Sequence, residues 1–263
     1  MRKLSLLLAV MMLICCFAAC GETETAKIES TADLVGKKIG VQLGTTGDIV
    51  IAGEIEGAEI MRYSKAIDAA MALADGKIDA VIVDLEPAKN IVAAMPELKL
   101  LENADYAPED YAIAVKKGNT ELLGLIDVVL AEIKANGTYA NLVKGFIETA
   151  EGERAPYITG DQVGTEGTII MATNAEFPPF EYTLDDGTVV GLDIEIAKLI
   201  AAKANKTLVI KNTAFDSLLL ELSSGSVDFV IAGMTVNDER LQQVDFSQSY
   251  YTSEQAVIIR ADK

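Results

Sequence analysis

The chain of 263 residues contains no histidine and no tryptophan. Histidine is the commonest general base and the commonest metal ligand in proteins, so its absence argues against most hydrolytic and zinc-dependent chemistry. Positive charge is also scarce, because 22 Lys and Arg residues stand against 40 Asp and Glu, a net charge of −18. Such a surface repels nucleic acid and anionic lipid headgroups. We therefore expect no nucleic-acid partner, no metal and no cofactor.

Cysteine is confined to the first twenty residues, at Cys15, Cys16 and Cys20. The same stretch has a basic start, Arg2-Lys3, and an apolar run too short to span a membrane comfortably, which predicts a secretory signal peptide over residues 1–20. Its end, Phe17-Ala18-Ala19-Cys20, resembles a bacterial lipobox, although Phe17 stands where Leu is usual. We expect lipidation at Cys20, a polar tether over residues 21–27 and an extracytoplasmic protein anchored by lipid to the cell membrane. An ordinary signal peptide is the alternative.

One segment of the chain is nearly repeated. Residues Gly76–Val83 match Gly225–Ala232 in residue type at almost every position, and each copy follows an apolar helical run. The pattern predicts that one unit of helix, turn and buried strand occurs twice, in two similar α/β lobes. Ligands of open α/β sheets bind outside the carboxyl ends of the strands, so we expect function just past each copy. The alternative is that both copies are merely a common joint between helix and strand.

Short apolar strands alternate with helical runs along the rest of the chain, which predicts α/β layers with largely parallel sheets. Outside the repeat, strands are expected near residues 39–41, 59–61, 98–102, 111–115, 168–171, 208–210 and 256–259. Helices are expected near residues 67–74, 87–94, 120–135, 138–147, 194–204 and 239–243, after Gly47 and after Phe215. Residues 148–167 contain four glycines and no clear period, which predicts a linker or a long surface loop.

Two features of the first half could bind charged groups. The turn Gly44-Thr45-Thr46-Gly47-Asp48 opens a predicted helix directly after a strand, where backbone N–H groups can bind an anion such as a carboxylate. Plain turn chemistry is an equal alternative, and the Gly-Lys-Ser/Thr of a nucleotide loop is missing. Asp84 ends a buried strand, where a lone carboxylate needs a cationic partner such as an ammonium ligand. The alternative is that Asp84 caps the next helix.

Two features of the second half complement them. Arg240 lies in the first turn of a predicted helix, where the helix dipole disfavours a cation. A guanidinium held there can bind a carboxylate through two parallel hydrogen bonds, although an ion pair with Asp238 or Asp245 is equally compatible. Phe177 and Phe215 each lie between a strand and a helix, where they could cover the carbon chain of a ligand or simply belong to the core.

These features together complement a free α-amino acid. Its ammonium group would lie at Asp84, and its carboxylate would lie at Arg240 and the Thr45 turn. No nucleophile has a base beside it in the predicted arrangement, so we expect no catalytic residue and no enzyme.

Several segments of the chain resemble the amino-acid-binding solute-binding proteins of ABC importers, the polar amino acid family (bacterial extracellular solute-binding proteins, family 3). The resemblance covers nearly all of residues 28–147 and 168–263. The matching segments are Gly40–Gly47, Asp79–Pro87, Tyr111–Gly118, Thr173–Tyr182, Gly191–Ile194, Ala232–Arg240, Val244–Ser247 and Tyr250-Tyr251. It implies a two-lobe, type II periplasmic-binding-protein-like α/β fold in a monomer that closes on a polar amino acid and delivers it to an ABC permease in the membrane.

The two halves stand in the opposite order from that of the family, which places the half with Phe180-Glu181-Tyr182 first. The resemblance therefore implies a circular permutation, with the new ends in one of two hinge strands. We expect a smaller lobe over residues 28–107, a hinge over 108–111 and a larger lobe over 112–263, with a single covalent crossing. Residues 148–167 would join the original ends of the family, and the strand 256–259 would end beside Ile28. A fusion of parts from two paralogues is the alternative.

The resemblance also implies ligand contacts at the backbone end of the amino acid. Asp84, the Gly233 carbonyl and the Thr235 hydroxyl are expected to bind the α-ammonium group. Arg240, the Thr235 N–H and the turn at Thr45 and Thr46 are expected to bind the α-carboxylate.

At the other end, Phe177 and Phe215 are expected to sandwich the ligand's side chain, and Asn174 and Gln42 to face its tip. Family members that bind cationic amino acids often carry an acid where Asn174 stands, so this chain is expected to prefer a neutral polar side chain. Two other functions fit the same scaffold: a sensor that signals ligand occupancy to a membrane partner, and a dehydratase of small carboxylates with Glu176 as its acid.

Overall fold

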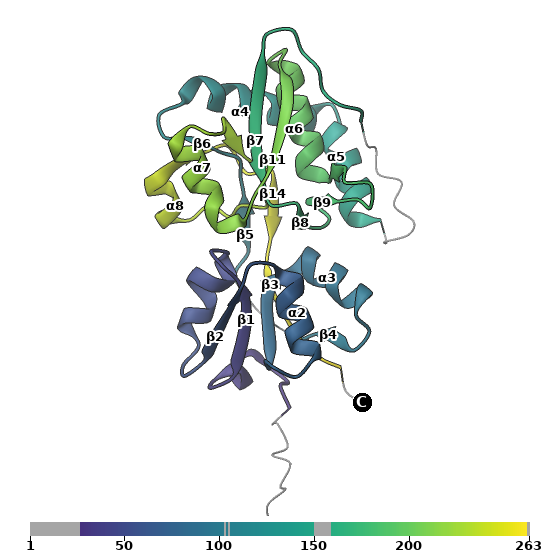
Figure 1. Cartoon of the computed structure of the whole chain (residues 1–263), viewed down its shortest axis with the longest axis vertical. Coiled ribbons are helices and arrows are strands. Elements are labelled where there is room, and N and C mark those ends of the chain that lie inside the picture. Colours follow the sequence, from purple (N-terminus) through teal and green to yellow (C-terminus); the bar gives the residue numbers. More distant parts are fainter. Residues whose placement is uncertain (1–26, 103, 105, 150–158, 262–263) are drawn as a thin grey trace, which may run out of the picture.

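The computed structural model describes residues 27–102, 104, 106–149 and 159–261. The predicted signal peptide, the lipidation site Cys20 and nearly all of the predicted tether lie outside these residues. Figure 1 shows two α/β lobes stacked along the long axis of the molecule, with strands β5 and β14 between them. No helix among the described residues is both long enough and apolar enough to cross a lipid bilayer.

The smaller lobe contains a five-stranded sheet in the order β2-β1-β3-β15-β4. Strands β2, β1 and β3 are parallel, whereas β15 runs antiparallel to both β3 and β4. The strands are β1 (Lys38–Gln42), β2 (Glu59–Tyr63), β3 (Ala80–Asp84), β4 (Leu98–Leu100) and β15 (Gln255–Arg260). The helical elements are η1 (Thr31–Leu34), η2 (Gly47–Ile51), η3 (Ala52–Glu54), α2 (Ala66–Ala74) and α3 (Leu85–Ala94).

The larger lobe repeats this plan with a sheet in the order β11-β7-β12-β6-β13. Its strands are β6 (Ala114–Lys116), β7 (Thr168–Thr173), β11 (Thr207–Asn212), β12 (Phe229–Val230) and β13 (Val244–Phe246). Its helical elements are α4 (Thr120–Ala135), α5 (Thr138–Val143), η4 (Lys144–Glu148), α6 (Leu192–Lys203), η5 (Phe215–Ser217), α7 (Leu218–Ser224) and α8 (Asp238–Gln243). A small sheet of β8 (Glu176–Phe177), β9 (Glu181–Thr183) and β10 (Val189–Val190) lies beside it.

The sequence repeat marks the same position in both lobes, as predicted. Its strands β3 and β12 are each the third of five, next to β1 and β7 respectively. The preceding helices end in the same way, because Gly76 and Gly225 adopt φ values of 72° and 79°, the left-handed conformation typical of a helix end. Asp79 and Asp228 then make equivalent bonds: each carboxylate accepts a backbone N–H, from Lys38 at 2.9 Å and from Ile170 at 2.7 Å.

The apolar core runs through both lobes and the connection between them. Helix α2 buries a stripe of small residues, including Ala69 and Ala70, against the smaller sheet. The same cluster continues through Tyr111, at the end of β5, to Ile126 of α4 and Ile200 of α6 in the larger lobe. Tyr111 therefore packs at the contact between the two lobes. The ends of the strands that face the cleft remain available to form a site.

The structure corrects the expected boundary of the larger lobe and the single crossing. Strands β5 (Glu109–Tyr111) and β14 (Tyr251–Ser253) pair antiparallel, and β14 leads directly into β15 in the smaller sheet. The chain therefore crosses between the lobes twice, both hinge strands are continuous, and residues 255–260 belong to the smaller lobe. The physical reason is burial: Val257 and Ile258 have no exposed surface, and only a place between β3 and β4 gives β15 neighbours on both sides.

The ends of the described chain meet in the smaller lobe. Ile28 packs on an apolar cluster that contains Val257 and Ile259 of β15, which is compatible with the expectation that the last strand ends near Ile28. The expected break within a hinge strand is wrong, because both ends lie beyond the hinge.

Two smaller expectations also differ from the structure. The helix expected after Gly47 is a π-helical turn, η2, followed by the 3-10 turn η3. The apolar stretch 111–115 is divided between β5 and β6, because the chain leaves the hinge ribbon after Tyr111 and enters the larger sheet at Ala114. This division turns the hinge strand away from the sheet and towards the cleft.

Candidate functional site

A small cavity lies between the lobes, at the carboxyl ends of strands in both sheets. The space between its lining residues is about 250 Å³, a volume that includes space open to solvent. Nine of the ten predicted binding residues line it: Gln42, Thr45, Thr46, Asp84, Phe177, Phe215, Gly233, Thr235 and Arg240. The tenth, Asn174, follows the end of β7 and hydrogen-bonds to Gln42. Residues from two distant parts of the sequence therefore surround one space, as the strand-end argument predicts.

Arg240 supplies the positive charge of the cavity. Asn237 caps the start of α8 by accepting the Arg240 N–H at 2.9 Å, which holds the first turn in place. The guanidinium is buried and donates to the carbonyls of Thr235 at 2.7 Å and, across the cleft, Gly44 at 3.0 Å. Burial lowers the Arg240 pKa. Because a guanidinium has five N–H donors, donors remain for a ligand carboxylate.

The surroundings of Arg240 distinguish the two interpretations of this residue. Asp245, one proposed partner for an ion pair, instead pairs with Lys117 at 2.9 Å. The face of the guanidinium lies over the ring of Phe215, with 5.5 Å from its central carbon to the ring centroid. This contact orients the plane of the guanidinium and joins the aromatic wall to the cationic group.

Asp84 supplies negative charge from the opposite lobe. It is buried at the end of β3, and its side chain makes no capping hydrogen bond to α3, so the helix-cap interpretation is wrong. The Tyr111 hydroxyl donates to Asp84 Oδ1 at 2.5 Å. Burial, followed by the nearby Glu109 carboxylate, raises the pKa of Asp84 well above its usual range. A cation brought to this carboxylate would offset that cost.

Glu109 is a site residue that the sequence analysis missed. It is half-buried in hinge strand β5 and accepts the hydroxyl of Thr235 from the larger lobe at 2.6 Å. It also accepts the side-chain N–H of Gln255, which pairs in register with Asp84. The signal was strand periodicity: Glu109 and Tyr111 are two residues apart, so they point to the same face of β5. The sequence predicts residues 108–111 only as a hinge, and that prediction assigns no ligand contact to Glu109.

The turn between β1 and η2 is shaped by its own hydrogen bonds. The Thr45 hydroxyl donates to the Gln42 carbonyl at 2.8 Å, and Asp48 accepts the Gly44 N–H at 3.0 Å. Arg62 pairs with Asp48 at 2.8 Å and fixes the carboxylate. These contacts are the turn chemistry considered as the alternative, and they also hold Thr45 and Thr46 against the cavity.

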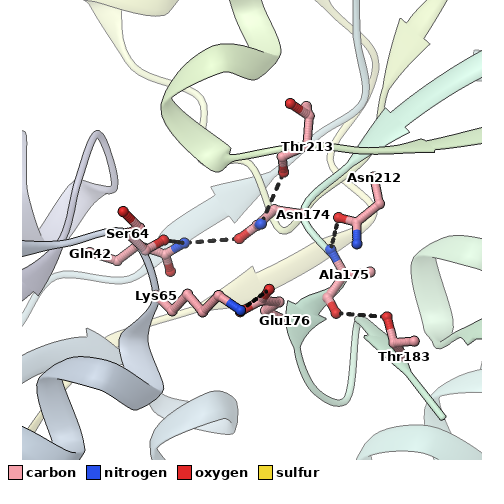
Figure 2. A network of polar contacts seen from close by, with 9 residues as sticks. All are labelled: Gln42, Ser64, Lys65, Asn174, Ala175, Glu176, Thr183, Asn212 and Thr213. Carbon is pink, nitrogen blue, oxygen red and sulfur yellow. Dashed lines mark hydrogen bonds and ion pairs between the residues drawn. The ribbon is translucent and has the colours of Figure 1, made fainter. Parts of the chain in front are cut away.

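Figure 2 shows a network of polar contacts in which side chains of the two lobes meet, beside the cavity-lining residue Gln42. The Gln42 Nε2 donates to Asn174 Oδ1 at 2.9 Å, and Asn174 Nδ2 donates to the Thr213 carbonyl at 3.0 Å. Beside them, Lys65 of the smaller lobe forms an ion pair with Glu176 of the larger lobe at 2.7 Å. The tip of the cavity is thus closed by two amides, and Glu176, the candidate catalytic acid, is bound to a cation.

The ring of Phe177 packs directly on the backbone of Gly233. Gly233 follows β12 with φ of 52°, and a Cβ there would lie 2.7 Å from the Phe177 ring, so no larger side chain fits without movement. Phe177 in turn stacks on Phe180, with centroids 5.9 Å apart. The close approach brings the Gly233 backbone and an aromatic face to the same side of the cavity.

No group of three or more His, Cys, Asp or Glu side chains is placed to bind a metal ion anywhere in the part of the chain that the structure describes. The lining of the cavity contains both a carboxylate, Asp84, and a guanidinium, Arg240, so it complements a molecule that carries a cation and an anion. It offers Asp84 to the cation and Arg240 to the anion.

Residues 169–263 match the family described as bacterial extracellular solute-binding proteins, family 3. The arginine-binding extracellular protein ArtP of Bacillus subtilis is 43% identical over 94 residues, which are 36% of either chain. A probable histidine-binding protein of Neisseria gonorrhoeae is 37% identical over 93 residues, and the L-cystine-binding protein TcyJ of Escherichia coli is 33% identical over 93 residues, 35% of either chain in both cases. The chain thus spans about a third of the length of these curated relatives. Among solved structures, an ancestral arginine-binding protein bound to arginine is 45% identical over 33% of this chain and 38% of its own, with a TM-score of 0.32.

Proposed function

We propose that this chain, whose residues 169–263 belong to the bacterial extracellular solute-binding proteins of family 3, is the substrate-binding protein of an ABC importer for amino acids. It captures a free amino acid outside the cytoplasm by closure of its lobes and delivers it to a membrane permease, and it is not an enzyme. The observation that carries the proposal is the cavity itself, with Asp84 of one lobe and Arg240 of the other in a single lining.

The proposed binding mode assigns each group of the ligand to groups of known position. The α-carboxylate binds Arg240, the Thr235 N–H and the turn at Thr45 and Thr46. The α-ammonium group binds Asp84, the Gly233 carbonyl and the Thr235 hydroxyl. Phe177 and Phe215 enclose the carbon chain, and the amides of Gln42 and Asn174 face its tip.

Contacts between the lobes support a mechanism of closure. Gly44 accepts a hydrogen bond from Arg240, Gln42 donates to Asn174, and Lys65 pairs with Glu176, so three separate contacts cross the cleft. All of them break if the lobes separate about the hinge ribbon of β5 and β14. Hinge closure around a ligand is a common way to couple binding to recognition by a partner.

The arrangement of the chain belongs to the same proposal. The chain is a circular permutant of its family, with residues 148–167 joining the original ends and the new ends in the smaller lobe. It acts as a monomer, and lipidation of Cys20 and the tether after it hold it at the membrane. The equivalent sheets of the two lobes and the meeting of Ile28 with Val257 and Ile259 support the permutation.

The amino-acid ligand is tested by a thermal-shift panel of the twenty amino acids, ornithine and cystine. A ligand that binds only the folded state raises the melting temperature by mass action. We expect at least one amino acid to do so and to bind with one-to-one stoichiometry in calorimetry. If none of them shifts the melting temperature at millimolar concentration, the proposed function is wrong.

The site assignment is tested by Arg240→Ala. Truncating one partner of a buried, charged hydrogen-bonded pair costs about 2 to 5 kcal/mol of binding free energy, so we expect binding to fall below detection. Lys203→Ala is the matched control, because it removes a cation from α6 whose ion pair with Glu132 is exposed. Unchanged affinity of Arg240→Ala for the amino acid would refute the assignment.

A further inference from the structure

We propose that Glu109 is a second carboxylate of the ligand site, and that it shares one proton with Asp84 in the empty protein. The ligand's ammonium group displaces this proton to solvent when it binds. The inference rests on the proposed function, because it concerns the same cavity and an ammonium ligand.

Glu109 accepts hydrogen bonds from both lobes. Its two carboxylate oxygens accept from different lobes, one from the hydroxyl of Thr235 and the other from the side-chain N–H of Gln255. Thr235 lines the cavity, and Gln255 is the strand partner of Asp84. The hinge strand thus brings a carboxylate to the end of the cavity where the ammonium group is expected.

Asp84 and Glu109 belong to one polar cluster, because Tyr111 of the same strand as Glu109 donates to Asp84, and Gln255, the strand partner of Asp84, donates to Glu109. Two neighbouring carboxylates cannot both remain ionised at low cost in a buried site, which favours a proton shared between them. The geometry of Asp84 allows this: its Oδ1 accepts from Tyr111, which leaves the other oxygen to carry the proton and donate it to Glu109.

The charged groups around the pair do not remove the need for a proton. From α8, the Arg240 guanidinium is attracted to both carboxylates, but its bonds go to the carbonyls of Thr235 and Gly44, and Glu239 on the same helix opposes it. From β5, Tyr111 is a neutral donor, since burial and Asp84 raise its pKa well above the usual range. From β9, the buried Glu181 carboxyl interacts with Asp84, but burial and Asp193 raise the pKa of Glu181 well above its usual range and favour its neutral form.

Charge is conserved when the amino acid binds and the proton leaves. The empty site holds two carboxylates, one proton and one guanidinium, which sum to zero. A zwitterionic amino acid adds its ammonium group near the pair and its carboxylate near Arg240. The ammonium replaces the proton as the positive charge between Asp84 and Glu109, and one proton is released to water without the making or breaking of a covalent bond to carbon.

The pH dependence follows from this release. Where the pair is protonated, binding must expel a proton, so the association constant rises about tenfold for each unit of pH. Above the pKa of Asp84, the proton is already absent and the affinity no longer changes. Since the pKa of Asp84 is raised by burial and by Glu109, the change lies above the usual range of an aspartate.

The experiment is calorimetry of L-glutamine and, in parallel, L-arginine in buffers with different ionisation enthalpies, between about pH 5 and about pH 8.5. The dependence of the observed heat on the buffer gives the number of protons released. We expect release approaching one proton at the acid end for whichever amino acid binds. Binding with no proton release at any pH would overturn the inference and leave the proposed function standing. Binding of neither these nor any other amino acid of the panel would overturn both.

The matched variants are Glu109→Gln and Asp110→Asn. The glutamine keeps an acceptor for Thr235 but lets Asp84 ionise, so proton release and the pH dependence of affinity should both disappear. Asp110 lies on the opposite, exposed face of β5, where it accepts from Thr252 at 2.7 Å, and its variant should release protons as the wild type does. Proton release that persists in Glu109→Gln would contradict the role of Glu109. A merely structural role would lower affinity equally at every pH.

Discussion

At the scale of single residues, the tip of the cavity decides which side chain is accommodated. Gln42 and Asn174 are neutral amides that both donate and accept hydrogen bonds, and the nearby acid, Glu176, is already paired with Lys65 (Figure 2). A cationic side chain would find no unpaired carboxylate there. We therefore propose that the site prefers a neutral polar ligand, which stays a prediction from Asn174.

The preference for a neutral ligand side chain should be reversed when the amide of Asn174 is replaced by a carboxylate. Asn174→Asp places a carboxylate at the tip that can still accept from Gln42 but no longer donates to the Thr213 carbonyl. Because a hydrogen bond to a charged group contributes about 1.5 to 3 kcal/mol, we expect the affinity for arginine relative to glutamine to rise about tenfold or more. Competition calorimetry measures the ratio.

Asn212→Asp is the control for Asn174→Asp, because Asn212 accepts the Ala175 N–H at 2.9 Å, whereas Asn174 accepts from Gln42, which lines the cavity. It adds the same charge to the same lobe. An equal gain for arginine in both variants would show a general effect of charge, and would contradict the assignment of Asn174 to the tip.

At the scale of elements, the repeated helix end and strand depend on backbone conformation as much as on burial. Gly225 ends α7 with φ of 79°, a conformation that costs a residue with a Cβ about 1 to 2 kcal/mol. Gly225→Ala should therefore lower the melting temperature by several degrees, and Gly76→Ala, at φ of 72°, should act alike. Thermal unfolding followed by circular dichroism measures both.

Gly124→Ala supplies a control of the opposite sign. Gly124 lies inside α4, and a Cβ there would meet no atom within 4 Å. Alanine in a helix interior is favoured over glycine by about 0.5 to 1 kcal/mol, so this variant should melt higher than the wild type. A loss of stability in Gly124→Ala equal to that in Gly225→Ala would mean that left-handed φ is not the cause.

The helices and strands show how much of the fold and of the site could be predicted from the sequence. Periodicity located α2, α3, α4 and β15, because each buries a continuous apolar pattern. It could not assign β15 to a lobe, since buried strands of either sheet have the same composition, and only the ladder with β3 and β4 decides. Charged residues at strand ends indicated Asp84 and Arg240. Glu109 escaped notice because its role depends on the hinge ribbon, which pairs residues 140 or more positions apart.

At the scale of the whole molecule, the proposed permutation can be undone. A chain that starts at Thr168, joins Ala261 to Ile28 through a short linker and ends at Glu148 would have the family's order of halves. Since Ile28 packs with Val257 and Ile259, the new joint should disturb neither the cavity nor the hinge. We expect the rearranged protein to bind the same amino acid with similar affinity, as measured by calorimetry. A folded protein that had lost binding would contradict the equivalence of the two chain orders.

The position of the two ends has a consequence for the design of optical reporters. Residues Ile28 and Ala261 both belong to the smaller lobe. The distance between two labels attached near them would therefore not change when the lobes move relative to each other. Thr159 belongs to the larger lobe, where its hydroxyl donates to Glu195 of α6 at 2.6 Å. A pair of dyes, one near Ala261 and one near Thr159, would span the moving joint, so the chain order of this protein puts one natural attachment point on each side of the cleft.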